Sequence, residues 1–304
     1  MKLDKISKDL LEKIANLHDI PTGAVSFRKD GKTQVMRSST NIEIEKKQDG
    51  SGINVYIHSS CQHEACHIPV VITENGLFDL VYNDFYIEDG ADVVIIAGCG
   101  VHSNEEAGHD GIHTFHIGKR ANVVYVENHL ATGKGDNKVM SPSTIIKLGE
   151  YSTMTMNTTQ LGGVDYSQRK TKAVLKEGAT LNVNEKVLTD RFDVAKTDFV
   201  IDMSGKDCKC NIVSRSVARG ESEQVFKSTL NGKNSCFGHV ECDGILLDGA
   251  KIDSVPRVSA KHREASLSHE AAIGRIAEEQ IVKLMTLGLT KEEAEEKIIQ
   301  GFLR

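Results

Sequence analysis

Short β-forming segments recur along most of the chain at a nearly constant interval. From about residue 30 to about residue 258, runs of β-branched and apolar residues follow glycine-containing turns, as in EDGADVVI and KEGATLNVNE. The turn glycines at 90, 118, 149, 178 and 205 are separated by 28, 31, 29 and 27 residues. Near-regular spacing in this range is typical of solenoid and propeller repeats. The spacing therefore predicts a nearly all-β region made of stacked repeats.

A parallel β-helix explains this repeat better than a sandwich does. Each coil would stack on the previous one, and Gly or Asn would be needed where the chain turns a corner in left-handed conformation. A sandwich or jelly roll stays open as the alternative, because sequence does not distinguish coiled pairing from hairpin pairing. The strands are expected at INVYIH (53–58), PVVIT (69–73), DVVIIAG (92–98), NVVYVE (122–127), STMTM (152–156) and TLNVNE (180–185).

Helical patterns are expected at both ends of the β region. Within residues 1–29, apolar residues recur every three to four positions from Leu3 to Ile14, which predicts a short N-terminal helix. Residues 30–258 form the predicted β-helix core, and residues 259–304 the predicted C-terminal helical domain. In that tail, a helix is expected to begin near His269-Glu270 and to end near Gly288. A second helix is expected after the capping box Thr290-x-x-Glu293.

Composition narrows the class of protein. The formal net charge of −6 gives no support for nucleic-acid binding, and the absence of Trp weakens any site that needs aromatic platforms. No stretch approaches the roughly 20 apolar residues of a membrane span, and the N-terminus lacks a signal peptide's apolar core. Seven cysteines fit a disulfide framework poorly. We therefore expect a cytoplasmic protein, not bound to membranes, with reduced thiols.

Two clusters of metal-ligand residue types lie in the first half of the chain. SSCQHEACH contains Cys61, His63, Cys66 and His67, but it lacks the second Cys pair of strong zinc patterns, so a surface loop is the simpler interpretation. HSNEEAGHDGIHTFH contains four histidines and is interpreted as a solvated acidic connection between coils. On a strand, its last two histidines, three residues apart, would point to opposite faces.

Two cysteine pairs follow in the second half. Cys208 and Cys210 are two residues apart, so on a strand their thiols point the same way. Cys236 and Cys242 also lie an even number apart, with His239 between them. Buried, inert thiols are the commoner case for such residues.

The C-terminal segments carry a resemblance to a known family. ECDGILLDGAKIDSVPRV and ASLSHEAAIGRIAEEQIVKLMTLGLTKEEAEEKIIQGF resemble the C-terminal region of the SufB/SufD scaffold subunits of SUF iron–sulfur cluster assembly. The resemblance implies a right-handed parallel β-helix followed by a helical domain that docks the ABC-type ATPase SufC. It also implies a scaffold that receives sulfur from a donor, gathers iron, and transfers a transient cluster to apo-protein acceptors.

Particular residues match the family's motifs. Cys242 matches the cysteine that SufB needs for assembly, and Glu270 with His269 matches the His-Glu pair near that cysteine. A cysteine at 242 makes the chain SufB-like at this site. The chain departs from the family in its shorter length, in lacking the N-terminal cysteines, and in having Ser268 where SufB carries Glu. These departures suggest a minimal system in which one scaffold forms a homodimer through the β-helix.

The chemistry agrees with that interpretation. Thiolates hold iron–sulfur clusters, and a set that mixes Cys242 with the weaker ligands Glu270 and His269 would allow the cluster to be released. The further candidates for this set are Cys236, Cys208 and Cys210. The leading hypothesis is therefore a scaffold without enzymatic turnover of its own. The alternatives are a SufD-like structural partner of the ATPase, in which Cys242 is a buried core thiol, and a β-helix carbohydrate-active enzyme.

Overall fold

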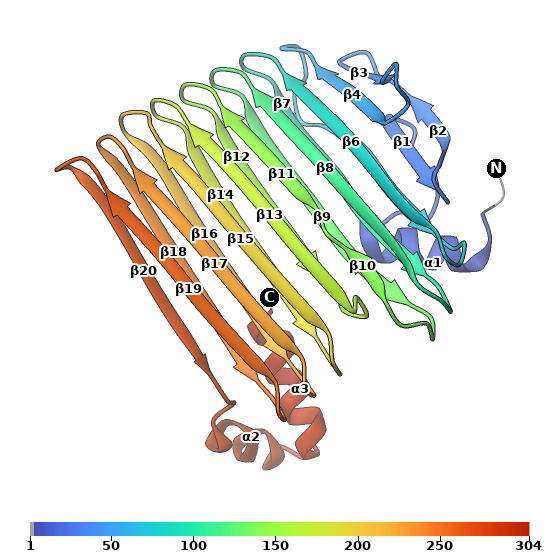
Figure 1. Ribbon diagram of the computed structural model, residues 1–304, viewed down its shortest axis with the longest axis vertical. Coiled ribbons are helices and arrows are strands. Elements are labelled where there is room, and N and C mark those ends of the chain that lie inside the picture. The colour runs from blue at the N-terminus through green and yellow to red at the C-terminus, as the bar shows by residue number, and fades with distance from the viewer. Residues whose placement is uncertain (1–2, 304) are drawn as a thin grey trace.

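The chain folds as a β-solenoid of about eight turns with one N-terminal and two C-terminal helices. The structure is a computed structural model that describes residues 3–303. Its coils stack side by side as a row of long, nearly parallel strands, from the N-terminal end to the C-terminal end (Figure 1). The predicted parallel β-helix is confirmed, and the sandwich alternative is wrong, because consecutive coils pair in parallel.

One wall of the solenoid, which we name sheet A, contains ten strands in the order β2-β1-β5-β7-β9-β12-β14-β16-β18-β20. All its pairings are parallel except β1 with β2. Its strands are β1 (Ala24–Lys29), β2 (Lys32–Arg37), β5 (Glu64–Ile72), β7 (Asp92–His102), β9 (Asn122–Thr132), β12 (Thr153–Gln160), β14 (Thr180–Thr189), β16 (Cys208–Ala218), β18 (Cys236–Leu246) and β20 (Ala265–Gly274).

The opposite wall, sheet B, runs in the order β19-β17-β15-β13-β10-β8-β6-β4-β3, and β11 also pairs with β13 and β8. Only β3 and β4 are antiparallel. Its strands are β3 (Ile42–Lys46), β4 (Gly52–Ile57), β6 (Phe78–Ile87), β8 (Ala107–Ile117), β10 (Lys138–Met140), β11 (Ser143–Leu148), β13 (Tyr166–Leu175), β15 (Val194–Met203), β17 (Glu223–Gly232) and β19 (Lys251–Ala260).

The core lies between the two sheets. Buried and partly exposed residues alternate along the strands, because successive side chains point to opposite faces. In-register pairing then places equivalent residues of successive coils in rows. One interior row of sheet A runs through Val93, Val123, Met154 and Leu181, all fully buried. On sheet B, the rings of Phe85 and Phe115 stack at 4.5 Å.

The turn glycines serve two different purposes. Gly90 has φ +75°, the left-handed conformation that glycine adopts without a Cβ penalty, as predicted. Gly205 does not have a positive φ, and the left-handed residue of its turn is Asp207. A Cβ on Gly205 would lie 2.0 Å from the Lys176 carbonyl carbon of the preceding coil. This glycine is therefore needed for the close stacking of turns rather than for the turn conformation.

The predicted N-terminal helix is α1 (Lys5–Ala15), capped by the Asp4 side chain, which accepts a hydrogen bond from the Ser7 amide. It packs on the outer face of sheet A, where Gly98 and Gly100 carry no side chains. A Cβ at Gly100 would lie 3.0 Å from the Leu10 Cβ. The last six residues of the segment 1–29 are strand β1, so this segment also begins the β-solenoid.

The C-terminal segment differs from its prediction in one important respect. The helix expected to begin near His269-Glu270 is wrong, because both residues lie inside strand β20. The helices are α2 (Glu278–Met285) and α3 (Lys291–Phe302), and the capping box of Thr290 and Glu293 is confirmed. The β-solenoid thus extends to Gly274, into the segment 259–304. Of the helices in residues 3–303, none has the length and apolar character needed to cross a membrane.

Candidate functional site

Cys242 lies near the C-terminal end of the solenoid and points into its interior. It is on β18, the last strand of sheet A with neighbours on both sides, and it is 1% exposed. Its neighbours in register are Ser214 on β16 and Ala271 on β20. On the side of Cys242 that faces the C-terminal end, its register neighbour is therefore only the small side chain of Ala271.

Cys242 is the last polar member of an interior row of polar residues, and such a row is unusual in a protein core. The row runs in register along sheet A through Glu127, Thr158, Glu185, Ser214 and Cys242. All five residues are buried. The flanking row two residues earlier in each strand is mostly apolar, with Met156, Val183, Ile212 and Val240. A line of polar groups thus leads through the core to Cys242.

The carboxylates in this row are compensated from sheet B. Arg169 on β13 contacts Glu127 through Nη1, and its Nε lies 3.9 Å from Glu185 Oε1. Burial opposes ionisation of Glu127, but the Arg169 guanidinium and nearby histidines outweigh it and hold the pKa of Glu127 well below its usual range. Burial raises the pKa of Glu185. Glu185 also accepts hydrogen bonds from Ser214 Oγ (2.8 Å) and Thr197 Oγ1 (2.9 Å).

The Cys242 thiol is held in its protonated form. Burial raises the pKa of Cys242 to about 11, although the nearby Ser254 hydroxyl of β19 favours the thiolate. The Ser254 hydroxyl oxygen is itself buried without a hydrogen-bond partner. A thiol reacts and binds metals as the thiolate, so Cys242 needs an incoming electrophile or metal cation to become a strong ligand.

The predicted His-Glu pair is divided between the two faces of β20. His269 pairs in register with Val240, so it faces the interior, as Cys242 does, one interior position away from Ala271. Its Nε2 atom is buried without a hydrogen-bond partner. Burial, and the neighbouring His239, lower the pKa of His269, so the ring is neutral and its nitrogen is free to accept a metal.

Glu270 lies on the outer face, where its side chain is 71% exposed. Its Oε1 atom is 3.2 Å from Nε2 of His239, and His239 Nδ1 is 2.8 Å from the Ser268 hydroxyl. The structure therefore brings Cys242 and His269 to one side of the sheet and places Glu270 on the other. In a helix, His269 and Glu270 would not be divided between two opposite faces. Their separation follows from the strand geometry of β20.

Beyond this coil the solenoid is open. We use the name open end for strands β19 and β20, which have no further coil next to them. Neither strand contains a buried residue. Val258 faces the interior, because it pairs in register with buried Leu230, yet it is 48% exposed. The site around Cys242 thus lies one strand away from an uncovered surface.

The further candidate cysteines lie in the same sheet, about six residues from Cys242 along the strands. Cys208 and Cys236 are register neighbours on β16 and β18, and both are buried. Burial raises the pKa of Cys208 to about 11 and also raises the pKa of Cys236, although a hydrogen bond from the Cys208 thiol opposes the latter shift. Cys210 is buried beside Leu181 and Gly238, and burial raises its pKa. The prediction that Cys208 and Cys210 point the same way is confirmed.

The two clusters of the first half lie largely within strands, although His63 is exposed in a loop, as expected. Cys61 and Cys66 are both fully buried, so the interpretation of surface thiols is wrong. The histidine-rich segment is largely strand β8, and His109 and His113 are buried, which contradicts the solvated loop. His116 points outward and stacks on Tyr86 at 5.0 Å, so the two last histidines of the segment do face opposite ways. The alternation of β8 was present in the sequence, but the acidic and glycine residues obscured it.

The polar row itself was missed by sequence reasoning. Its members are separated by 31, 27, 29 and 28 residues, from Glu127 to Thr158, Glu185, Ser214 and Cys242. These intervals match those of the turn glycines. Polar residues at one-coil intervals, each on an interior position of a strand, were the sequence signal that could have identified the row.

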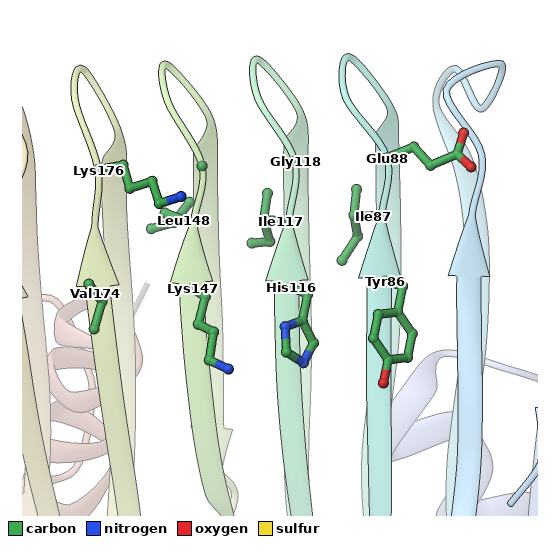
Figure 2. Close-up of a pocket in the computed structure, with 11 residues that line it drawn as sticks. Tyr86, Ile87, Glu88, His116, Ile117, Gly118, Lys147, Leu148, Val174 and Lys176 are labelled. Carbon is green, nitrogen blue, oxygen red and sulfur yellow. The ribbon is translucent and has the colours of Figure 1, made fainter.

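A large groove lies elsewhere on the molecule. It has a volume of about 560 Å³ and is on the outer face of sheet B. Figure 2 shows Tyr86, His116, Lys147 and Val174 in a row across successive strands along this groove. Its lining contains no cysteine, so it offers no thiolate to iron or sulfur.

One chain does not by itself supply a complete metal site. Within residues 3–303, no group of three or more His, Cys, Asp and Glu side chains is arranged to hold a metal ion. Cys242 and His269 provide a soft thiol and a neutral imidazole on one face, and Glu270 a carboxylate on the other. This is a partial donor set at an open end.

Comparisons with known proteins identify the family of this chain. The domain family described as "SUF system FeS cluster assembly, SufBD core domain" matches residues 74–302. The chain is 29% identical over 266 residues to an iron–sulfur cluster assembly SufBD family protein of Archaeoglobus fulgidus, covering 86% of this chain and 71% of that protein. It is 27% identical over 243 residues to a protein of the same description from Methanocaldococcus jannaschii, covering 78% and 75%.

A third relative is longer. The SufBD family protein of Methanothermobacter thermautotrophicus is 28% identical over 249 residues, which are 79% of this chain but 58% of that protein. The family match includes the open end, Cys242, the His269-Glu270 pair and both C-terminal helices. The chain therefore belongs to the SufBD family of the SUF system, whose members take part in iron–sulfur cluster assembly.

Proposed function

We propose that this protein is a SufB-like scaffold that assembles an iron–sulfur cluster at its open end. The observation that carries the proposal is the position of Cys242. It is an interior thiol in the last fully paired strand of sheet A, on the same face as His269, whose Nε2 atom is buried without a hydrogen-bond partner. Thiolate and imidazole are both ligands of iron in iron–sulfur proteins. The cluster is the cargo of the scaffold, and the protein has no enzymatic turnover of its own.

The incomplete donor set supports assembly across an interface. Strands with free edges pair readily with another chain, and the open end offers two of them. A homodimer joined through the open ends would place Cys242 and His269 of one copy near the same residues of the other copy. Glu270, on the outer face near the free edge, would supply a hard oxygen ligand for incoming iron.

Cys242 would act first as a sulfur acceptor. A thiolate at this position attacks the outer sulfur of a donor persulfide and becomes a persulfide itself. The raised pKa of Cys242 keeps the thiol unreactive until a donor or iron is bound, which protects it from oxidation. A mixed set of Cys, His and Glu would hold the cluster less firmly than four thiolates, so that acceptor apo-proteins can remove it.

The C-terminal helices would dock a SufC-like ABC ATPase in the cytoplasm. Helix α2 and the turn after it expose Val282, Met285 and Leu287 at 52%, 43% and 76%. Exposed apolar side chains gathered on one short element are typical of an interaction surface. Arg219, the residue that directly follows β16, forms an ion pair with Glu296 of α3, so movement of these helices would be transmitted to the end of the strand next to β18.

Anaerobic co-purification with the co-expressed ATPase tests this proposal. We expect the wild-type complex to contain iron, acid-labile sulfide and visible absorbance, and the Cys242→Ala complex to lose all three while still containing the ATPase. Cys99→Ala is the matched control, because Cys99 is also a buried interior thiol of sheet A but lies several coils away. Equal cluster content in wild type and Cys242→Ala would reject Cys242 as the site.

A SufD-like structural role is the second candidate. The 1% exposure and raised pKa of Cys242 are the properties of an inert core thiol, and they favour this alternative. A structural partner would bind the ATPase normally and contain no iron in either the wild type or the variant. The same purification therefore distinguishes the two candidates.

A further inference from the structure

Cys208 and Cys236 form a close pair of thiols in the interior of the solenoid. They are register neighbours on the parallel strands β16 and β18. Neighbouring strands of a sheet are about 4.8 Å apart, and disulfides join residues whose Cα atoms are roughly 4.4–6.8 Å apart. Both side chains are buried on the same, interior face of the sheet. A disulfide between them therefore requires rotation of two side chains and little movement of the backbone.

The pair is placed next to the open end. Cys236 is 6% exposed and Cys208 is fully buried behind it, one coil further from the end. The strand beyond Cys236 presents Ala265, a small and only partly buried residue. On sheet B, Gly232 faces the same sulfur, and a Cβ added there would lie 3.1 Å from Cys236 Sγ. Only the partly buried side chains of Ala265 and Leu267 therefore lie between Cys236 and the open end.

Among the described residues, no other pair of cysteines in sheet A shares these properties. Cys210, two residues from Cys208, is beside Leu181 and Gly238. Cys99 is beside Val70 and His129. Cys61 and Cys66 lie at the opposite, N-terminal end of the solenoid. The Cys208–Cys236 pair is thus the dithiol nearest to Cys242, roughly 20 Å away along β18 at about 3.3 Å per residue.

We propose that Cys208 and Cys236 act as a dithiol that reduces sulfane sulfur to sulfide at the open end. The proposal rests on the proposed scaffold function, because donated sulfane sulfur has to gain two electrons before it becomes the sulfide of a cluster. No cysteine needs to be a cluster ligand for this reaction. The Cys208–Cys236 pair therefore has a role separate from that of Cys242.

The reaction balances in two exchange steps. The Cys236 thiolate attacks the outer sulfur of a donor persulfide R–S–SH, forming Cys236–S–SH and releasing R–SH after protonation. The Cys208 thiolate then attacks the inner sulfur of Cys236–S–SH, forming the Cys208–Cys236 disulfide and expelling HS⁻. Overall, the dithiol loses two electrons and two protons, and R–S–SH becomes R–SH and hydrogen sulfide. A cellular dithiol reductant returns the pair to its reduced state by thiol–disulfide exchange.

The test uses the full chain in reduced form, without iron, and glutathione persulfide as the sulfur donor. For the wild type we expect about one equivalent of sulfide per chain above the protein-free background. Peptide mapping under non-reducing conditions should show Cys208 linked to Cys236. Cys208→Ser should keep a persulfide on Cys236 and release no extra sulfide, and Cys236→Ser should do neither. Cys99→Ser, the matched buried-thiol control, should behave as wild type.

Two results would overturn the proposal. One is the absence of a Cys208–Cys236 linkage in the wild type after sulfide release, and the other is equal sulfide release by wild type and Cys208→Ser. Gly232→Ala adds a test that leaves both thiols in place. Its methyl group would crowd Cys236 Sγ, so sulfide release should slow while folding, followed by circular dichroism, is retained. An unchanged rate of sulfide release by Gly232→Ala would contradict the inference that the sulfur donor reaches Cys236 past Gly232.

A second source of sulfur separates this proposal from the scaffold function. When ferrous iron and inorganic sulfide are supplied together, Cys208→Ser should assemble as much cluster as wild type, because no reduction is needed. With glutathione persulfide as the only sulfur source, Cys208→Ser should assemble several-fold less. If Cys242→Ala assembles no cluster with either sulfur source, the result bears on the scaffold function. If Cys208→Ser assembles as much cluster as wild type with both sulfur sources, the dithiol proposal is refuted.

Discussion

The two ends of the solenoid differ in how the chain finishes them. At the N-terminal end, the antiparallel pairs β1–β2 and β3–β4 interrupt the parallel stacking, and β3 buries Ile42 and Ile44. Helix α1 covers the outer face of sheet A nearby, with Leu11 and Ile14 fully buried (Figure 1). At the open end, β19 and β20 are parallel strands without a buried residue.

The difference is the basis for proposing that the open end is the surface that meets a partner. A free strand edge is a template for pairing with another chain, and proteins usually block it. At the N-terminal end the terminal strands, β2 and β3, are antiparallel to their neighbours, and β3 is partly buried. At the open end the terminal strands β19 and β20 are parallel to their neighbours, and Cys242, His269 and the Cys208–Cys236 pair lie close to this end.

The largest expected effect compares one apolar truncation at each end. Leu11→Ala removes a fully buried side chain from the packed face of α1 and should lower the free energy of unfolding by about 2–5 kcal/mol. Val258→Ala at the open end, where the side chain is 48% exposed, should cost less than about 0.5 kcal/mol. Urea unfolding of both variants and the wild type measures these two changes in the free energy of unfolding. Similar losses would show that the open end is packed as firmly as the capped one.

The interior of the N-terminal half should also be sensitive to acid. Burial lowers the pKa of His113 in the folded protein to about 4, below its ordinary value of 6.5. Between these values the unfolded chain binds a proton that the folded chain does not, so stability falls as the pH drops from 6.5 towards 4. The full shift corresponds to about 3 kcal/mol. Unfolding measured at about pH 7 and about pH 5 should therefore show a shallower pH dependence for His113→Asn than for wild type.

The residual slope in His113→Asn has a defined source. Burial also lowers the pKa of His129, which faces the same carboxylate, Glu127. Its contribution has the same sign, so some loss of stability on acidification should persist. An unchanged slope in His113→Asn would show that His113 contributes nothing to this pH dependence.

A charge at the open end should weaken self-association. Val258→Asp places a carboxylate at the surface proposed to join two copies, and burying it without a partner should raise the dimer dissociation constant by at least about tenfold. Val174→Asp is the matched control, because Val174 is 44% exposed but lies on the outer groove of sheet B. Analytical ultracentrifugation compares them. Equal weakening by both would place the dimer interface somewhere other than the open end.

The smallest expected effect concerns the attachment of the C-terminal helices. Arg219→Gln removes the ion pair with Glu296, whose side chains are 30% and 49% exposed. Solvent screening limits such a pair to less than about 1 kcal/mol. Limited proteolysis should detect slightly faster cleavage between β20 and α3, with global unfolding unchanged within error. A large loss of global stability would show that α3 is an integral part of the solenoid.

Much of the fold could be predicted from the sequence because its repeat is local. The turn spacing, the β-branched runs and the capping box of Thr290 each depend on residues close together in the chain, and all three were confirmed, although only some of the turn glycines are left-handed. The spacing of Cys208 and Cys210 also predicted thiols on the same face. The segment around His269 could not be read in this way, because its apolar residues fit a helical period as well as the last strand of a sheet.

The sequence by itself determined the coil length, the alternation of core and surface, and the membership of Cys242 in a recognisable motif. The tertiary structure alone decided that Cys242 and His269 share the interior while Glu270 faces outward, since this depends on β20 pairing in register with β18. It also decided that Cys208 meets Cys236 rather than Cys210. Stacking brings together residues about one coil apart, whereas neighbours along a strand are held apart by the extended backbone.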